Sequence, residues 1–268
     1  MIKLVAIDLD DTLLNSKKQI SQKNTMIIKN KAKKGTKFVI ATGRPFVQNT
    51  IDFHKQLGLF NDNQLYIGYN GAAIYDVKLK KPIYTKALNN TEINEIEDFF
   101  KTIAKSRYIH LDGAICCNMV NDYSELERTF NSIDIIVGDL TKYDAAYKYM
   151  VADEPKIIKE IFSKIPSELL EKYNIFISMP CFIEVIKKEI NKYDAVKKVA
   201  EHLNINENEI MAIGDSMNDY EMIKYAKVGV AMAGAVETVK EVADFITLTN
   251  DLDGVGYAID NIIKETNY

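Results

Sequence analysis

Long apolar runs and paired cysteines are both missing from this sequence. No stretch approaches the roughly 20 apolar residues that a membrane-spanning helix needs, and there is no internal repeat or low-complexity linker. The three cysteines, Cys116, Cys117 and Cys181, are an odd number and lack the spacing of metal ligands. We therefore expect reduced thiols, buried in the case of the adjacent pair, rather than a disulfide framework.

An excess of positive charge is also missing. The formal net charge is −4 over 268 residues, so neither nucleic acid nor an anionic membrane is expected as the main partner. The first residues lack the basic segment, apolar core and cleavage site of a secretory signal, so we expect a cytoplasmic protein. The length suffices for one large domain or two ordinary ones.

The sequence does contain a concentration of acid after its first apolar run. Residues 4–7 are apolar, as expected of a strand covered on both faces, and Asp8, Asp10 and Asp11 follow at once. Like charges about 4 Å apart repel by roughly 1 to 4 kcal/mol, depending on the local dielectric. A buried site would keep these acids ionised only if a cation lay among them.

Strands and helices alternate in the two flanks of the chain, residues 1–82 and 188–268. This alternation predicts a parallel α/β sheet with right-handed crossovers. The helix at 21–34 carries a run of lysines, which we interpret as a solvated face rather than a phosphate-binding patch. The expected strands of the flanks are residues 4–7, 37–41, 64–68, 210–213, 228–232 and 245–248.

The segment between the flanks, residues 83–187, has a different pattern. Strands follow strands there, which predicts an antiparallel sheet with helices packed on one face, and therefore an inserted α+β domain. The expected strands are residues 83–86, 107–111, 114–119, 147–152, 174–179 and 182–186.

Polar residues follow three of the predicted parallel strands. Asp8 and Asp10 follow the first, Thr42 and Gly43 the second, and Asp215 the strand at 210–213. Because ligands gather beyond the carboxyl ends of strands in open α/β sheets, these residues are expected to converge. Lys192 begins the helix that leads into the 210–213 strand.

Phosphoryl transfer through an aspartyl-phosphate needs this set of groups. One carboxylate attacks phosphorus, and a second acid protonates the leaving oxygen and then activates water. The repulsion between two anions must be cancelled by a divalent metal and a lysine. The Thr42 hydroxyl and the Gly43 amide can donate hydrogen bonds to phosphate, with glycine permitting close backbone approach.

The expected metal is magnesium. Carboxylate and carbonyl oxygens are hard ligands, and none of these motifs contains histidine or cysteine. The three histidines, His54, His110 and His202, are scattered along the chain, so we expect ordinary, partly exposed side chains rather than metal ligands.

Four parts of this chain resemble, in order, the four motifs of the haloacid dehalogenase-like (HAD) phosphatases: DLDDTL at 8–13, ATGR at 41–44, Lys192 and GDSMND at 214–219. YNGA from Tyr69 and VAMAGA…VADFIT…DGVGYAI resemble the Cof-type subfamily. The resemblance covers essentially the whole chain and is strongest in the flanks. It implies a Rossmann-like parallel-sheet catalytic core, residues 1–82 and 188–268, and an α+β cap for substrate specificity, residues 83–187.

The resemblance also implies a role for each matching residue. Asp8 would be the nucleophile and a metal ligand, and Asp10 the general acid/base, binding metal through its backbone carbonyl. Asp215 would complete the magnesium site, while Asp219 would orient metal-bound water or Lys192 from outside it. The groups implied to hold phosphate are the Leu9 amide, Thr42, Gly43, Lys192 and Asn218.

The sequence departs from the family pattern at a few positions. The family often has glycine where this chain has Asp11, whose side chain we expect to point away from phosphate or to cap a turn. Ala233 and Gly234 replace Gly and Asn of the common VAMGNA, and Tyr193 replaces the usual small residue after the lysine. Whether Arg44 faces the cap stays open.

Three functions are compatible with these residues. The leading one is a Mg²⁺-dependent phosphatase for a small phosphorylated metabolite, such as a sugar phosphate, because a cap would close over the site and exclude large substrates. A phosphomutase would use the same aspartyl-phosphate but return the phosphoryl group to its product. A sensor would bind a phosphometabolite without turnover. The sequence does not indicate the oligomeric state.

Overall fold

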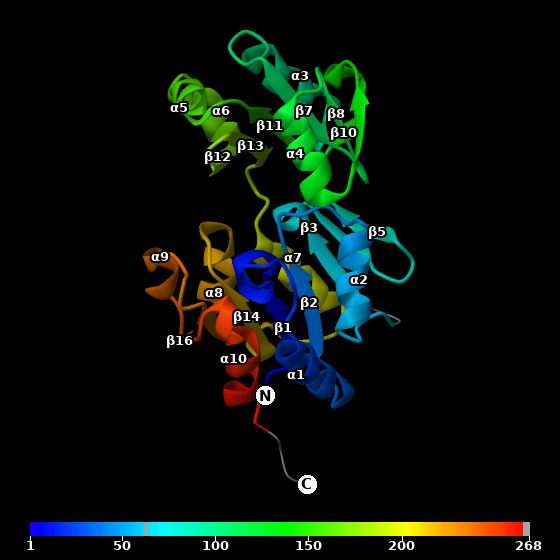
Figure 1. Ribbon diagram of the computed structural model, residues 1–268, viewed down its shortest axis with the longest axis vertical. Helices are drawn as coiled ribbons and strands as arrows, with labels where there is room; N and C mark the ends of the chain where they lie inside the picture. Colours follow the sequence, from blue (N-terminus) through cyan, green and yellow to red (C-terminus); the bar gives the residue numbers. More distant parts are fainter. Residues whose placement is uncertain (62–63, 265–268) are drawn as a thin grey trace. The chain divides into compact units, whose positions relative to one another are not determined.

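The computed structural model describes residues 1–61 and 64–264, which fold into two compact units (Figure 1). Unit 1 comprises Met1–Gly43, Thr50–Tyr84 and the chain from Asn191 onward. Unit 2 comprises Arg44–Asn49 and Thr85–Ile190. Most of the segment that changes in sequence pattern thus lies in unit 2, together with Arg44–Asn49 from the first flank.

Unit 1 is built on an eight-stranded sheet in the order β16-β15-β14-β1-β2-β3-β4-β5. Neighbouring strands from β16 to β3 run parallel, and β3 pairs with β4 antiparallel. The predicted parallel α/β sheet is therefore confirmed. Its strands are β1 (Leu4–Ile7), β2 (Lys37–Ala41), β3 (Leu65–Gly68), β4 (Ala73–Asp76), β5 (Lys81–Thr85), β14 (Ile210–Gly214), β15 (Val228–Ala231) and β16 (Phe245–Ile246).

The first strand lies in the middle of this sheet. β1 pairs with β14 on one side and with β2 on the other, so Ile7 lies beside both Ile213 and Ile40. All four residues of β1 are buried. This is the double-sided burial that its uninterrupted apolar sequence predicts.

Helices alternate with the parallel strands of unit 1, and one helix follows the last strand. The N-cap Ser21 begins α1, accepting a hydrogen bond from the Asn24 amide, and Asn24 Oδ1 in turn accepts one from the Gly256 amide of α10 at 2.8 Å. These helices are α1 (Gln22–Lys33), α2 (Gln48–Gln56), α7 (Lys192–His202), α8 (Tyr220–Tyr225), α9 (Glu237–Lys240) and α10 (Gly254–Ile262). Among the described residues, no helix is long and apolar enough to cross a membrane.

Unit 2 contains a six-stranded sheet in the order β12-β13-β11-β7-β8-β9 and a two-stranded pair, β10-β6. The large sheet is antiparallel except for β8 and β9, which run parallel. Its strands are β7 (Ser106–His110), β8 (Ala114–Cys117), β9 (Asp134–Val137), β11 (Lys148–Ala152), β12 (Tyr173–Met179) and β13 (Phe182–Lys187), and the short pair is β6 (Leu88–Asn89) with β10 (Ala145–Ala146).

Both faces of the unit 2 sheet are covered. Along β11, Tyr149 and Val151 enter one hydrophobic cluster, while Met150 and Ala152 enter another on the opposite face. The expectation of helices on one face only is wrong, because Tyr123 of α4 packs against the second cluster. The helices of unit 2 are α3 (Asn90–Phe100), α4 (Asp122–Asn131), α5 (Pro155–Ser163) and α6 (Ser167–Lys172).

Two details of the sequence analysis need correction. The strand expected at 83–86 belongs to the edge of the unit 1 sheet as β5, because it continues the hairpin that β3 and β4 begin. The lysine run of α1 is not fully solvated, since Lys31 is buried and its Nζ donates to the Ile263 carbonyl at 2.7 Å. The adjacent thiols Cys116 and Cys117 are free and buried, as expected.

A buried ion pair lies within unit 2. The carboxylate of Glu97 in α3 accepts hydrogen bonds from Arg107 Nη2 at 3.0 Å and from Tyr149 Oη at 2.5 Å. The side chains of Arg107 and Glu97 are only 12% and 10% exposed. Arg128 and Glu125 form a contrasting ion pair on the surface of α4, where they are 54% and 41% exposed.

We predict that Arg107→Met lowers the free energy of unfolding by about 3 to 5 kcal/mol, because it leaves the buried Glu97 carboxylate without its cation. The matched change Arg128→Met should stay within about 0.5 kcal/mol of the parent protein. Denaturant unfolding of both variants measures the difference. Equal effects of the two changes would contradict the assignment of the Glu97 pair as structural.

Candidate active site

The three adjacent strands β14, β1 and β2 end at one edge of the unit 1 sheet, and each is followed by a predicted site residue. Asp8 follows β1, Thr42 follows β2 and Asp215 follows β14. Backbone hydrogen bonds continue the sheet pattern there: the Asp8 amide donates to the Ile213 carbonyl at 2.9 Å, and the Thr42 amide to the Ile67 carbonyl at 3.0 Å. The predicted convergence is therefore present in the fold.

The Lys192 ammonium lies at the centre of this edge. Its Nζ is 2.6 Å from Asp8 Oδ1 and 2.6 Å from Asp219 Oδ1, and the residue has no exposed surface. The N-cap Asn191, whose Oδ1 accepts a hydrogen bond from the Asp194 amide, places Lys192 in the first turn of α7. Residues more than 180 positions apart in sequence are thus joined by one side chain.

Charge keeps this lysine protonated. Burial alone would lower the pKa of Lys192, but the carboxylates of Asp219 and Asp8 outweigh that effect and raise the pKa above its usual value. Asp219 also accepts hydrogen bonds at Oδ2 from the amides of Asp215 and Ser216, at 3.0 and 3.1 Å. Both oxygens of Asp219 are therefore engaged in holding the lysine and the turn after β14.

The acids at this edge outnumber the cation. Asp8, Asp215 and Asp219 each offer a carboxylate oxygen within 4.8 Å of the others. Burial and the carboxylate of Asp219 raise the pKa of Asp8 even though Lys192 opposes them, and the same two causes raise the pKa of Asp215. The all-oxygen donor set and its unbalanced negative charge fit a hard divalent cation such as Mg²⁺. Asp219 accepts three hydrogen bonds, from Lys192 and two amides, whereas Asp215 accepts one at each oxygen and Asp8 accepts one from Lys192. Asp8 and Asp215 therefore keep more acceptor capacity for a cation than Asp219 does.

The other predicted phosphate-binding residues lie along the same edge. Leu9 and Thr42 are buried, and the Asn218 Nδ2 donates to Asn70 Oδ1 at 3.0 Å. The position that a Gly43 Cβ would occupy is 3.1 Å from that same Asn70 oxygen. Gly43 and Asn218, far apart in sequence, therefore meet at the side chain of Asn70.

Asp10 and Asp11 occupy a distorted helical turn, Leu9–Leu13. Asp11 has a φ of 56°, a left-handed conformation in which glycine is at ease and aspartate is tolerated. Its side chain is 66% exposed and lies 3.3 Å from the Lys18 ammonium, which also lies 3.2 Å from Asp10. Asp11 thus points to solvent.

Four residues that contact the site were not predicted from the sequence. Thr12 Oγ1 donates to Asp215 Oδ1 at 2.8 Å, and Ser216 Oγ donates to Asp215 Oδ2 at 2.8 Å. The other two residues are Lys18, which contacts Asp10, and Asn70, which contacts Asn218. Thr12 and Ser216 lie within the DLDDTL and GDSMND motifs, so their hydroxyl groups could have been predicted as site residues. The position of Lys18 could not, because it approaches Asp10 only through the turn between Leu14 and Ile20.

The histidines are placed differently from expectation. His54 and His110 are buried, not partly exposed, and only His202 lies on the surface. Burial lowers the pKa of His54 to about 4, and its Nδ1 lies 2.7 Å from the Thr50 carbonyl. A neutral imidazole can be buried when a ring nitrogen has a hydrogen-bond partner. Neither buried histidine belongs to the acidic cluster of Asp8, Asp215 and Asp219.

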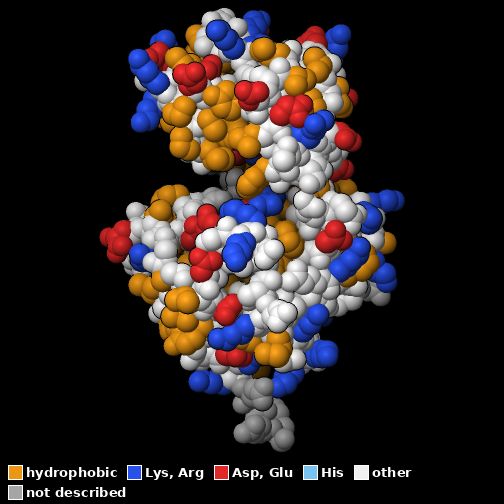
Figure 2. All heavy atoms as spheres, in the orientation of Figure 1, with side chains coloured by type: hydrophobic (Ala, Val, Ile, Leu, Met, Phe, Trp, Pro, Cys, Tyr) orange, Lys and Arg blue, Asp and Glu red, His pale blue; other side chains and the backbone are white. Residues whose placement is uncertain are grey.

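Arg44 groups with unit 2 rather than with the site residues of unit 1. The segment Arg44–Asn49 belongs to unit 2, and the Arg44 guanidinium lies 4.6 Å from the centre of the Phe130 ring in α4. Unit 2 exposes several large hydrophobic side chains, Phe130 among them. Figure 2 shows hydrophobic side chains gathered on part of its surface.

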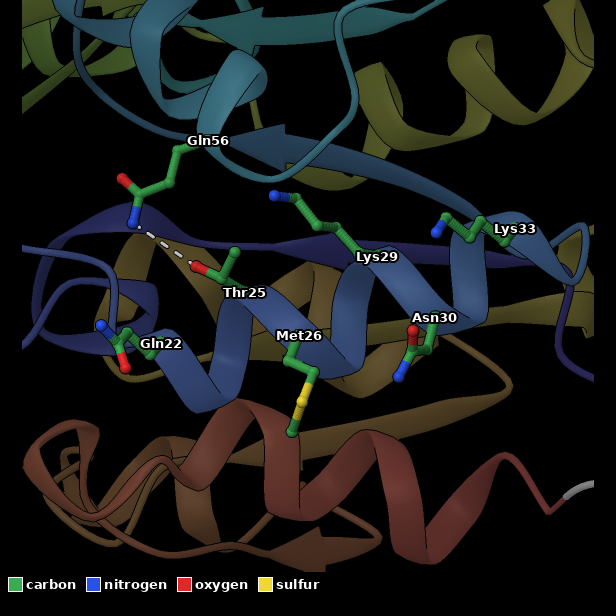
Figure 3. Close-up of a pocket in the computed structure, with 7 residues that line it drawn as sticks. All are labelled: Gln22, Thr25, Met26, Lys29, Asn30, Lys33 and Gln56. Carbon is green, nitrogen blue, oxygen red and sulfur yellow. Dashed lines mark hydrogen bonds between the residues drawn. The ribbon is translucent and has the colours of Figure 1, made fainter.

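A surface pocket of about 270 Å³ lies along α1, outside the acidic edge. Figure 3 shows Lys29 and Lys33 extending from α1 and Gln56 approaching Thr25 across the pocket. Flexible lysines and amides without a buried charge make it a solvated helix face. Its lining residues are Gln22, Thr25, Met26, Lys29, Asn30, Lys33 and Gln56.

The chain is similar in sequence and in fold to known proteins. A family model described as haloacid dehalogenase-like hydrolase matches residues 5–259. The chain is 32% identical over 260 residues to the 5-amino-6-(5-phospho-D-ribitylamino)uracil phosphatase YcsE of Bacillus subtilis, covering 96% of this chain and 94% of that protein. It is 31% identical over 275 residues to YxeH of the same organism, covering 98% and 99%. A crystal structure of a haloacid dehalogenase-like hydrolase from Bacteroides thetaiotaomicron superposes with a TM-score of 0.87 at 32% identity, covering 98% of this chain and 100% of that one.

We predict that Asp11→Gly leaves the free energy of unfolding within about 1 kcal/mol of the parent protein. The change removes a surface ion pair worth about 0 to 1 kcal/mol, and it removes the steric cost of a Cβ in the left-handed conformation. Asp11→Val, which puts a β-branched side chain at the same φ, should destabilise by about 1 to 2 kcal/mol. Denaturant unfolding compares the two variants, and a valine variant as stable as the glycine variant would contradict the left-handed assignment.

Ionised Asp215 should destabilise the folded protein at neutral pH when no cation is bound, because its pKa is raised in the fold. Asp215→Asn removes that charge and keeps an acceptor for Thr12. We expect the variant in chelator at pH 7 to melt about 2 to 4 °C higher, which corresponds to about 1 kcal/mol in a protein of this size.

The sign of the pH dependence follows from the same shift. The advantage of Asp215→Asn should be greatest above the raised pKa and vanish below about pH 4, where the parent carboxyl is protonated both folded and unfolded. Added Mg²⁺ should stabilise only the parent protein. Thermal denaturation across pH measures both effects, and a variant less stable than the parent at pH 7 in chelator would refute the charge imbalance.

Proposed function

Because this chain belongs to the haloacid dehalogenase-like phosphatases of the Cof type, we propose that it hydrolyses a small phosphorylated metabolite with Mg²⁺ through a phosphoryl-aspartate at Asp8. Phosphoric monoester hydrolysis is the activity of the family. The metal, the covalent step and the substrate class are what the proposal adds.

One observation carries the proposal: a buried carboxylate and a buried ammonium are held together at the carboxyl edge of the sheet. Asp8 is 5% exposed, and Lys192 Nζ lies 2.6 Å from it. An oxygen nucleophile beside a fixed cation is what attack on a phosphate ester requires. A purely structural ion pair would not explain why Asp215 and Asp219 add further negative charge at the same place.

The first step of the reaction forms a bond from Asp8 to phosphorus. An Asp8 oxygen attacks the phosphorus atom, the bond to the leaving oxygen breaks, and Asp10 donates a proton to that oxygen. Lys192 offsets the charge of the attacked phosphoryl group. Its oxygens accept hydrogen bonds from the Thr42 hydroxyl, the amides of Leu9 and Gly43 and the Asn218 side chain.

The second step releases phosphate. Water attacks phosphorus, Asp10 takes up a proton from it, and the bond from phosphorus to Asp8 breaks, which restores both carboxyl groups. Asp8, the Asp10 backbone carbonyl and Asp215 would hold Mg²⁺. When bound, the ion neutralises charge on the phosphoryl oxygens and lowers the repulsion between the anions. Asp219 keeps Lys192 in place throughout both steps.

We assign catalysis to residues 1–82 and 188–268 and substrate choice to residues 83–187, as core and cap. The division of the chain into two compact units near Thr85 and Ile190 supports this assignment. A cap that closes over the site during turnover would favour small substrates over nucleic acid or large proteins. The relative YcsE is named for a phosphorylated ribityl compound, which supports a sugar or polyol phosphate as the substrate class here.

We predict that Asp8→Asn lowers kcat for phosphate release by at least about a thousandfold, because an amide cannot form the phosphoryl intermediate. The matched control Asp11→Asn removes an acid three residues away that points to solvent, and should retain activity within about threefold. Release of inorganic phosphate from the variants and the parent, with Mg²⁺ and with chelator, measures the effect. Full activity of Asp8→Asn would exclude Asp8 as the nucleophile.

The substrate class is tested with a panel of sugar, polyol and nucleoside monophosphates. Magnesium-dependent phosphate release from some members is expected. Conversion of one phosphate ester to its isomer without release would indicate a phosphomutase instead. Tight binding of one member without release from any would indicate a sensor.

A further inference from the structure

The turn between β3 and β4 has an unusual backbone. Three successive residues, Tyr69, Asn70 and Gly71, have positive φ values of 51°, 57° and 104°. Tyr69 and Asn70 are also buried, at 1% and 8% exposure. Two adjacent non-glycine residues in the left-handed region are strained, and such strain persists only where the surrounding structure enforces it. The turn therefore has a geometric task that a relaxed turn would not meet.

Asn70 connects this turn to two of the proposed phosphate-binding groups. Its amide donates to the Thr42 carbonyl at 2.9 Å, and its side-chain Oδ1 accepts a hydrogen bond from Asn218 Nδ2 at 3.0 Å. The Asn70 side chain also occupies the space that a Cβ on Gly43 would need, at 3.1 Å. A side chain at position 43 would therefore press on Asn70, which would have to shift by a few tenths of an ångström.

Gly71 connects the same turn to the helix that carries Lys192. A Cβ on Gly71 would lie 2.3 Å from the Asn191 carbonyl oxygen, a distance that backbone atoms cannot relieve. Asn191 is the N-cap of α7 and directly precedes Lys192. The turn Tyr69–Gly71 therefore touches the chain beside Thr42 and Gly43, the side chain of Asn218 and the residue before Lys192.

We propose that Asn70 is a positioning residue that fixes the Asn218 side chain and the Thr42–Gly43 segment in the geometry that binds the phosphoryl group. Asn218 has two N–H donors, and giving one to Asn70 orients the other. Asparagine suits the position because it tolerates the left-handed backbone and supplies the acceptor oxygen. The inference depends on the proposed function, since it assigns a task within that same site.

Three substitutions separate the side chain from the backbone strain. Asn70→Ala removes the acceptor and keeps a Cβ in the left-handed conformation. Asn70→Gly removes the acceptor and relieves the strain. Asn70→Asp keeps an acceptor oxygen and adds a negative charge beside Asn218. The matched control is Asn204, an exposed asparagine with a φ of 54° after the far end of α7, changed to Ala and Gly.

The readouts are kcat, KM and the inhibition constant for orthovanadate, a phosphate mimic, together with the melting temperature. Both Asn70→Ala and Asn70→Gly should raise the inhibition constant about tenfold, the effect of about 1.4 kcal/mol, although the glycine variant should melt at the higher temperature. Asn70→Asp should weaken vanadate inhibition further. The Asn204 variants should leave KM and the inhibition constant within twofold of the parent.

A positioning role and a merely structural one give different results. Lower melting temperatures with unchanged KM and unchanged vanadate inhibition would overturn the proposal. If the alanine variant does not accumulate as folded protein, the glycine and aspartate variants decide the question by the same constants. A parent protein that releases no phosphate from any substrate would contradict the proposed function, whereas an active parent with unaffected Asn70 variants would contradict only this inference.

Discussion

The site depends on one interaction, the buried ammonium of Lys192 between the carboxylates of Asp8 and Asp219. Moving a lysine out of water costs several kcal/mol, and only close opposite charge offsets that cost. Two carboxylates at 2.6 Å supply it. The arrangement needs α7 to begin at the right place and β1 and β14 to end side by side, so the capping of Asn191 and the parallel register of the sheet both bear on the chemistry. Breaking any of these would leave a buried charge without its partner.

The same interaction explains the charge balance of the site. One ammonium faces three carboxylates, and burial of those carboxylates raises the pKa values of Asp8 and Asp215. The protein alone therefore stabilises the ionised site incompletely. A divalent cation would complete it, and a phosphoryl group would then bring negative charge to a place where cations and N–H donors converge. The excess of carboxylates over ammonium groups thus destabilises the ionised site without a metal and favours binding of a metal.

The sequence predicted the parts of the site that follow from strand ends. Asp8, Thr42 and Asp215 each follow an apolar run, and adjacent parallel strands bring such positions together without further information. The parallel sheet of the flanks was predictable for the same reason. The buried strand β4 was missed because it is only four residues long and follows β3 after a tight turn. β5 was assigned to the insert because the local sequence of an edge strand does not show which sheet it joins.

Other features depend on contacts that no local pattern encodes. Aspartate and asparagine tolerate a left-handed backbone but do not require one. The sequence therefore does not reveal the left-handed conformation of Asp11 and Asn70, and only the fold shows where their side chains point. Burial of His54 and His110 is set by what packs around them rather than by their neighbours in sequence. Lys18 reaches Asp10 only because a turn reverses the chain. Long-range packing, not composition, decides these positions.

The central claim is that Asp8 becomes covalently phosphorylated during turnover. Borohydride reduces an acyl phosphate but not a free carboxylate, so adding it to protein quenched during turnover, followed by peptide mass spectrometry, tests the claim directly. The account predicts conversion of Asp8 to homoserine in the presence of substrate and Mg²⁺, and no conversion without substrate. Phosphate release with Asp8 unmodified, or with another carboxylate modified in its place, would contradict it.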